Sequence, residues 1–426
     1  MEQALLVADA FSPLTVVSVL RLANGSTPEV LQQALAMLQR RHPLLRAKIG
    51  YQNGRPAFEI SESATPIPVH VVDWQDDRQW QVMARAELNQ RVDTTSAPLL
   101  RCTYLYGAGD NTPSDLIVAY HHTLMDAASG IRLHHQLLSW CEAIAAGTDV
   151  AAGDDHPLPL LPAAENLFPP TFKGVRRWWR MLPFLWRQMR DEVAYQKPAS
   201  REQKAPIHPA STCDILTLCL PTAVTTALVR RARRERVTMN SVLAAAMLMT
   251  VHTSIYNART LPLRGITFAN LRPYLKPPIP DDRLGCYITM SSYTVPMHHG
   301  ITFWNVARFI HNKTYQFGKS GDKFLAATMS KRLMQALIRF QQFRMGTIAL
   351  SYVGPVDLEP VYGTIRVQSL HGFTANNRLG PVYVAFAKIL HGQLWWDLQY
   401  LTADMDRQTA QVLVDNIRAI LKTAME

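Results

Sequence analysis

The sequence has few cysteines for its length, and they follow no pattern that would use them. Five cysteines are widely spaced among 426 residues, and no two form a Cys-x-x-Cys pair. Such a set predicts neither a disulfide framework nor a zinc site. The sequence also lacks a Gly-x-Ser-x-Gly motif, which leaves a serine nucleophile with little support.

Long apolar runs are missing as well. The best one, residues 242–251, is about ten residues long, whereas a helix needs roughly 20 to span a bilayer. The N-terminus carries Glu2 in place of a basic patch, and no long apolar segment follows, so we expect no signal peptide. The sequence therefore predicts a soluble protein of the cytoplasm.

Acidic residues are fewer than basic ones, 33 against 44, which gives a formal charge of +11 and a pI near 9.5. This charge suits an anionic membrane surface, the phosphates of coenzyme A or an acidic carrier protein. The basic residues are spread along the chain, and no nucleic-acid-binding motif accompanies them, so we expect no nucleic-acid partner.

The most informative segment is a histidine pair followed by an aspartate. His121 and His122 end an apolar, strand-like run, Asp126 comes four residues after His122, and a helical pattern follows to about residue 146. Histidine titrates near neutral pH, so His122 at a strand end could take up a proton and return it in one catalytic cycle. The alternative is structural: Asp126 would cap the helix, and His121 would be a packed, hydrogen-bonded side chain.

Structural rather than catalytic roles are predicted for three other histidines, His42, His134 and His135. A helix is predicted after the capping sequence 26–29, it ends near His42 before Pro43, and a strand is predicted from residue 44 to 49. His42 is interpreted as a turn residue. The second pair, His134 and His135, lacks an acidic partner at the same spacing and is expected to be at the surface or half-buried.

The composition changes between residues 147 and 209, where prolines mark an irregular connector. Within it, basic and aromatic residues alternate over residues 173–190, as in an interfacial amphipathic helix, which would contact membrane or a lipid-like substrate. The alternative, which we favour from sequence, is a crossover helix whose tryptophans pack between two lobes, with Pro183 breaking the helix.

These motifs together resemble the condensation-domain-like acyltransferases that use thioesters and carry the motif His-His-x-x-x-Asp. Three further segments support the resemblance: Phe268–Pro273 resembles an Asn-x-Arg-Pro element, Arg283–Tyr287 a Leu-Gly-Asn stretch, and Leu350–Gly354 a Ser-Asn-x-Gly element. The resemblance implies an α/β fold with mixed sheets, in which two chloramphenicol-acetyltransferase-like lobes form a V around a central tunnel. We expect the N-terminal lobe at residues 1–170, a crossover at 171–209 and the C-terminal lobe at 210–426.

The resemblance also implies roles for individual residues. His122 would be the general base, His121 and Asp126 would support it, and Arg272 would pair with Asp126. The remaining predicted site residues would bind the oxyanion or line the tunnel: Ser129, Gly130, Ser351, Tyr352 and Gly354. Three positions depart from the family pattern: Ala127 replaces a glycine, and Cys286 and Tyr352 stand where asparagine is frequent.

The implied reaction is acyl transfer from a thioester of coenzyme A or an acyl carrier protein to an alcohol or amine acceptor, in lipid or secondary-metabolite biosynthesis. No metal or redox cofactor is expected. Ester formation is favoured over amide formation. Two alternatives stay open: a stand-alone condensation enzyme that forms amides, and a non-catalytic module that docks a carrier.

Overall fold

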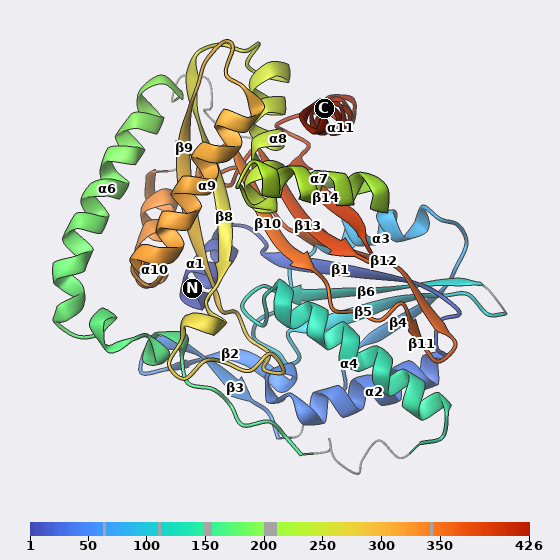
Figure 1. Ribbon diagram of the computed structural model, residues 1–426. Helices are drawn as coiled ribbons and strands as arrows, with labels where there is room; N and C mark the ends of the chain where they lie inside the picture. The colour runs from blue at the N-terminus through green and yellow to red at the C-terminus, as the bar shows by residue number, and fades with distance from the viewer. Residues whose placement is uncertain (63–64, 110–111, 149–155, 200–210, 341–343) are drawn as a thin grey trace.

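The computed structural model describes residues 1–62, 65–109, 112–148, 156–199, 211–340 and 344–426 (Figure 1). These residues form two lobes, each built on a six-stranded mixed sheet with helices packed against it, and a separate two-stranded hairpin. The predicted α/β class with mixed sheets is therefore confirmed. Within the described residues, no helix is both long and apolar enough to cross a membrane.

The first sheet has the strand order β11-β12-β1-β6-β5-β4. Its strands are β1 (Thr15–Ala23), β4 (Val69–Asp73), β5 (Leu100–Tyr106), β6 (Pro113–His121), β11 (Val361–Tyr362) and β12 (Ile365–Thr374). Apolar side chains on one face pack against α2 (Pro28–Arg41) and α4 (Ala127–Ala145), and those on the other face pack against α3 (Gln79–Leu88). Burial of both faces fixes the register of β1 and β6 at the centre of the sheet.

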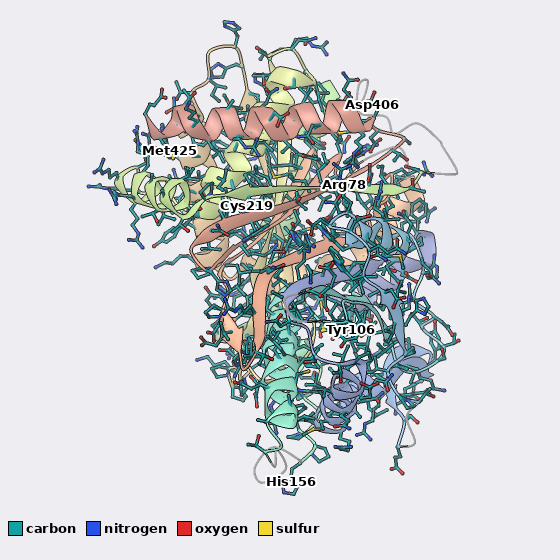
Figure 2. The ribbon with its side chains drawn as sticks, turned by 90° about the vertical axis from the view of Figure 1, so that its right-hand side faces the viewer. Arg78, Tyr106, His156, Cys219, Asp406 and Met425 are labelled. Atoms are coloured by element: carbon teal, nitrogen blue, oxygen red, sulfur yellow. The ribbon has the colours of Figure 1, made fainter. Side chains whose placement is uncertain are left out.

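The second sheet has the order β7-β14-β13-β10-β8-β9. Its strands are β7 (Cys213–Leu220), β8 (Leu261–Asn270), β9 (Ile288–Met297), β10 (Ile348–Pro355), β13 (Tyr383–Leu390) and β14 (Gln393–Leu401). The apolar helix α8 (Met239–Ser254) is buried against this sheet among α7 (Thr222–Arg234), α9 (Phe303–Ser320) and α11 (Arg407–Met425). Figure 2 shows the second lobe, with Cys219 and α11, above the first lobe with Tyr106.

Three elements lie outside these two layers of strands and their covering helices. The hairpin pairs β2 (Ala47–Gln52) with β3 (Arg55–Ile60). Helix α1 (Glu2–Phe11) packs against α10 (Asp322–Phe340), and the long helix α6 (Arg176–Ala199) runs along the outer edge of the molecule (Figure 1).

Two strands from the second half of the chain, β11 and β12, complete the first sheet. β12 comes from the second half of the chain but pairs antiparallel with β1 in the first sheet, with Val17 opposite Phe373, and its side chains enter both cores of the first lobe. The expected C-terminal lobe of residues 210–426 does not anticipate this placement. The alternation of apolar and polar residues at the start of β12 indicates a strand, but it does not indicate which sheet the strand joins.

The helix after Thr27 and the helix to residue 145 are confirmed, and Thr27 and Asp126 are their N-caps. The strand predicted from residue 44 starts later, because residues 43–46 form a 3₁₀ turn after Pro43 and β2 begins at Ala47. The predicted break at Pro183 is also wrong. α6 continues through Pro183, since burial of Met181 and Phe184 against α10 offsets the hydrogen bond that proline removes.

Candidate active site

The histidine pair lies where strand β6 ends between β1 and β5. The His122 amide donates to the Leu14 carbonyl at 3.3 Å, and the Leu124 amide donates to the His121 carbonyl at 2.9 Å, so both ends of the turn are fixed by backbone bonds. Helix α4 begins five residues after His122, with Asp126 as its cap. The pair therefore sits on a short, rigid connection between a central strand and a buried helix.

His122 is half-buried and lines a cavity of about 290 Å³ between the two lobes. The cavity walls come from β1, β12 and the start of α4 in the first lobe, and from β8, β10 and β13 in the second. Burial, reinforced by the neighbouring His121, lowers the pKa of His122 below its usual 6.5. Among the described residues, its Nδ1 has no hydrogen-bond partner. His122 is therefore a neutral imidazole beside an interior space, a state in which it can accept a proton.

His121 is fully buried and is held by hydrogen bonds. Its Nδ1 lies 2.7 Å from the Thr123 hydroxyl oxygen, and its Nε2 lies 3.6 Å from Oδ1 of Asp9 on α1. It does not line the cavity that contains His122. The position fits the predicted supporting role for His121, because the ring fixes the turn from the side of α1.

Asp126 and Arg272 form the pair that the sequence predicts, and both are buried. One Asp126 oxygen, Oδ2, accepts from Arg272 Nη1 at 2.7 Å and from the Tyr287 amide at 2.9 Å, while Oδ1 accepts from the Ser129 amide at 3.0 Å. Both oxygens are thus occupied by donors. A carboxylate in this arrangement joins β6, α4 and the segment after β8, and is not free to take a proton from a substrate.

The backbone amides of Ser129 and Gly130, predicted as oxyanion donors or tunnel residues, are already engaged in hydrogen bonds, and Gly130 lines the cavity. The Ser129 amide is bound to Asp126, and the Gly130 amide donates to the Asp126 carbonyl at 2.9 Å. The Ser129 hydroxyl bonds to Arg272 at 2.6 Å and to Gly285. The first two residues of α4, Ala127 and Ala128, line the cavity, and no hydrogen bond of the described residues uses their amides.

The predicted tunnel residues divide into two groups. Ser351 and Tyr352 on β10 line the cavity, as expected. Burial raises the pKa of Tyr352 to about 12, so its phenol stays protonated. Gly354 does not line the cavity. It is buried with φ of +83°, at a shift in the register between β10 and β13, where glycine is the residue that this backbone favours.

A second cavity, of about 480 Å³, reaches the same turn at Thr123. Its walls come from α1, the hairpin strand β3, residues 158–165, the segment of Leu284 to Tyr287, and α10. Two interior spaces therefore meet the loop that carries the histidine pair, one at His122 and the other at Thr123.

Sequence reasoning missed several residues that line the cavity, among them Ser18 on β1 and the buried His371 on β12. The Ser18 hydroxyl lies 2.7 Å from Nε2 of His134 on α4. His134 is buried, not at the surface as expected, because it faces the sheet across this hydrogen bond, and burial lowers its pKa to about 4. No local signal marks this contact, since 116 residues separate the two side chains. His42, interpreted as structural, is buried with its Nε2 at 2.7 Å from Gln136.

The described residues contain no group of three or more histidine, cysteine, aspartate or glutamate side chains that could hold a metal ion.

Comparison with solved structures matches the whole chain. Polyketide synthase associated protein 5 from Mycobacterium tuberculosis aligns with 100% of this chain and 96% of its own, with a TM-score of 0.70 at 17% identity. Trichothecene 15-O-acetyltransferase from Fusarium sporotrichioides aligns with 100% and 94%, with a TM-score of 0.77 at 10% identity. The first condensation domain of the calcium-dependent antibiotic synthetase aligns with 100% and 95%, with a TM-score of 0.67 at 13% identity.

The chain has the condensation-domain and acyltransferase fold. The fold that the resemblance implies is thereby confirmed. Residues 211–316 also match the model of the phthiocerol/phthiodiolone dimycocerosyl transferase C-terminus. A segment of 147 residues is 34% identical to phosphinothricin tripeptide synthetase PhsC from Streptomyces viridochromogenes, covering 33% of this chain. The chain spans about an eighth of that curated relative, 13% of its length.

Proposed function

We propose that this protein is an acyltransferase that moves an acyl group from a thioester of coenzyme A or an acyl carrier protein to a hydroxyl or amine acceptor. The observation that carries the proposal is the place of His122, which lies on a rigid turn and lines a cavity between the lobes. Burial lowers its pKa below 6.5, which favours the neutral imidazole that a base requires. A thioester is already activated, so the reaction needs a base and an oxyanion site but no covalent enzyme intermediate.

In the proposed reaction, His122 removes the proton from the acceptor while the acceptor oxygen or nitrogen attacks the thioester carbonyl carbon. The carbon–sulfur bond then breaks, and His122 returns the proton to the departing thiolate. The amides of Ala127 and Ala128, at the positive end of α4, would stabilise the oxyanion between these two steps. No metal or redox cofactor takes part.

Asp126, Arg272 and His121 act as positioning residues in this proposal. The hydrogen bonds of both Asp126 oxygens to Ser129, Arg272 and Tyr287 hold the start of α4 against the second lobe. His121 holds the turn through Thr123. Geometry fixed in advance is what a positioned general base requires.

The match to a transferase C-terminus and the fold shared with an O-acetyltransferase support ester formation in lipid or secondary-metabolite biosynthesis. A second candidate is amide formation by a condensation enzyme, which the match to a tripeptide synthetase and the fold of an antibiotic-synthetase condensation domain support. Both use the same base and differ in the acceptor. If no thioester is turned over, the remaining alternative is a non-catalytic module that docks a carrier protein.

The test is thiol release from a panel of acyl-coenzyme A and acyl-carrier thioesters, each offered to alcohols and to amines. Wild-type protein is compared with His122→Ala. Acceptor-dependent release that is lost in the variant supports acyl transfer, and the productive acceptor separates ester from amide formation. Folded wild-type protein that releases no thiol across the panel, or a variant equal to wild type, would contradict the proposal.

A further inference from the structure

The outer face of α6 carries a continuous apolar stripe that no other described element covers. Six large side chains on this face, together with Val175 directly before the helix, are between 49% and 79% exposed; the six are Trp178, Trp179, Leu182, Trp186, Met189 and Val193. They recur every three or four residues, so they lie on one side of the helix. The three tryptophans are a third of the nine in the whole chain.

The opposite face of α6 already holds the helix to the second lobe. Met181 and Phe184 are buried against Leu325 of α10, and Tyr195 is buried beneath the Arg264 guanidinium, 4.1 Å from its ring centre. Arg187 is paired with Asp322 at 2.9 Å. The helix is therefore docked through its inner face, and the outer stripe is not part of the core. Exposed apolar surface of this extent marks a site of interaction.

The charges that border the stripe over residues 173–190 are of one sign. Residues 173–190 contain six basic side chains and no acidic one. The two acidic residues that follow, Asp191 and Glu192, are turned to Arg264. Arg177 lies over Trp178 and Arg190 over Trp186, at 5.5 and 5.3 Å from the ring centres. An apolar stripe bordered by cations fits an anionic partner. Repulsion between like charges disfavours the pairing of this stripe with the same stripe of a second copy.

The aromatic content favours a bilayer over an acidic protein as that partner. Tryptophan is enriched at the membrane–water interface, where its ring lies among the headgroups, and arginine can extend its charge to phosphates while its stem contacts apolar surface. α6 runs along the edge of the molecule with its outer side open (Figure 1). The stripe from residue 175 to 193 is about 27 Å long at 1.5 Å per residue.

We propose that α6 is a peripheral membrane-binding helix, which lies in the interface of anionic phospholipid bilayers with its tryptophan stripe inserted. It binds parallel to the surface, as amphipathic helices with a basic border do. The proposal differs from the sequence interpretation that we favoured, in which the tryptophans pack between the lobes, because the structure exposes all three.

The experiment is co-sedimentation of the full chain with vesicles of phosphatidylcholine alone or with a quarter of phosphatidylglycerol. The wild-type protein should bind the anionic vesicles and dissociate from them at high salt. Replacing Trp178, Trp179 and Trp186 with serine should lower the partition coefficient by at least about tenfold. Replacing the exposed Arg176, Arg180 and Arg190 with glutamine should lower it by about 100-fold.

The matched control removes the same charge elsewhere, by replacing Arg230, Arg233 and Arg234 of α7 with glutamine. These residues are also exposed, and the variant should bind nearly as wild type does. Unchanged thermal unfolding of each variant shows that the fold is kept. Absence of wild-type binding, equal binding to neutral vesicles, or equal loss in the α7 control would overturn the proposal. Binding to an acyl carrier protein through the stripe, without vesicle binding, would also overturn it.

Discussion

The chain has two adjacent histidine pairs within 15 residues, and the structure places them in different environments. His121 and His122 end a strand at the meeting of two lobes, whereas His134 and His135 lie inside helix α4. In the second pair both rings have partners, Ser18 for His134 and Tyr362 for His135. In the first pair His121 is held at Nδ1 by Thr123, while His122 lines the cavity. The Nδ1 atoms of His122 and His134 alike have no hydrogen-bond partner among the described residues.

Burial alone does not make a histidine a base. It lowers the pKa of both His122 and His134. Of these two histidines, His122 is the one that lines the cavity between the lobes and lies on a backbone turn fixed from both sides. The difference therefore lies in what the ring can reach, and it can be tested by changing each pair in turn.

The largest expected effect is the loss of activity in His122→Ala. Removal of a positioned general base costs about 100- to 10,000-fold in rate, so thiol release should fall by at least about 100-fold. His135→Ala is the matched control, because His135 is also the second residue of its pair and is half-buried. Equal losses in the two variants would remove the distinction between the pairs.

The second-largest effect is expected from the Asp126–Arg272 ion pair, which anchors the loop of the first histidine pair and has no counterpart beside the second pair. Arg272→Met leaves the buried Asp126 carboxylate without its cation, so the free energy of unfolding should fall by about 3–5 kcal/mol. Urea unfolding followed by circular dichroism measures it. Adding Asp126→Asn removes the charge and should restore part of the loss. If Arg272→Met alone were as stable as wild type, the Asp126–Arg272 ion pair would not be what orders this loop.

In the second pair, His134 should make the free energy of unfolding depend on pH. The folded pKa of His134 is about 4, below its usual 6.5, so between these values the unfolded chain binds more protons than the folded one. The resulting stability is present above pH 6.5 and is lost as the pH falls toward 4, by up to about 3 kcal/mol. His134→Gln should flatten this slope in thermal unfolding. An unchanged slope would contradict the assignment.

The smallest effect is expected from Ser18→Ala, which removes the hydroxyl partner of His134. One lost hydrogen bond should cost about 1 kcal/mol in the free energy of unfolding. The rate of thiol release should stay near that of wild type if the second pair is structural. A large loss of rate without a loss of stability would give Ser18, which lines the cavity, a part in the reaction.

Local patterns in the sequence predicted the elements that are determined locally. The cap at Asp126, the helix that follows it and the helix after Thr27 depend on side chains within four residues, and the resemblance predicted the distant partner Arg272. The place of β11 and β12 in the first sheet could not be predicted, because an alternating pattern indicates a strand but not the sheet that it joins. The contact of His134 with Ser18 depends on tertiary packing, and so does the choice between the two apolar faces of α6.

The most direct test of His122 as the base is the pH dependence of kcat/KM with an alcohol acceptor, which does not titrate in the range. Because burial lowers the pKa of His122, kcat/KM should rise with pH through an apparent pKa below 6.5 and then level off. In His122→Ala this limb should disappear, and a low, pH-independent rate should remain. A rate that falls as the pH rises through this range, or the same limb in the variant, would contradict the account.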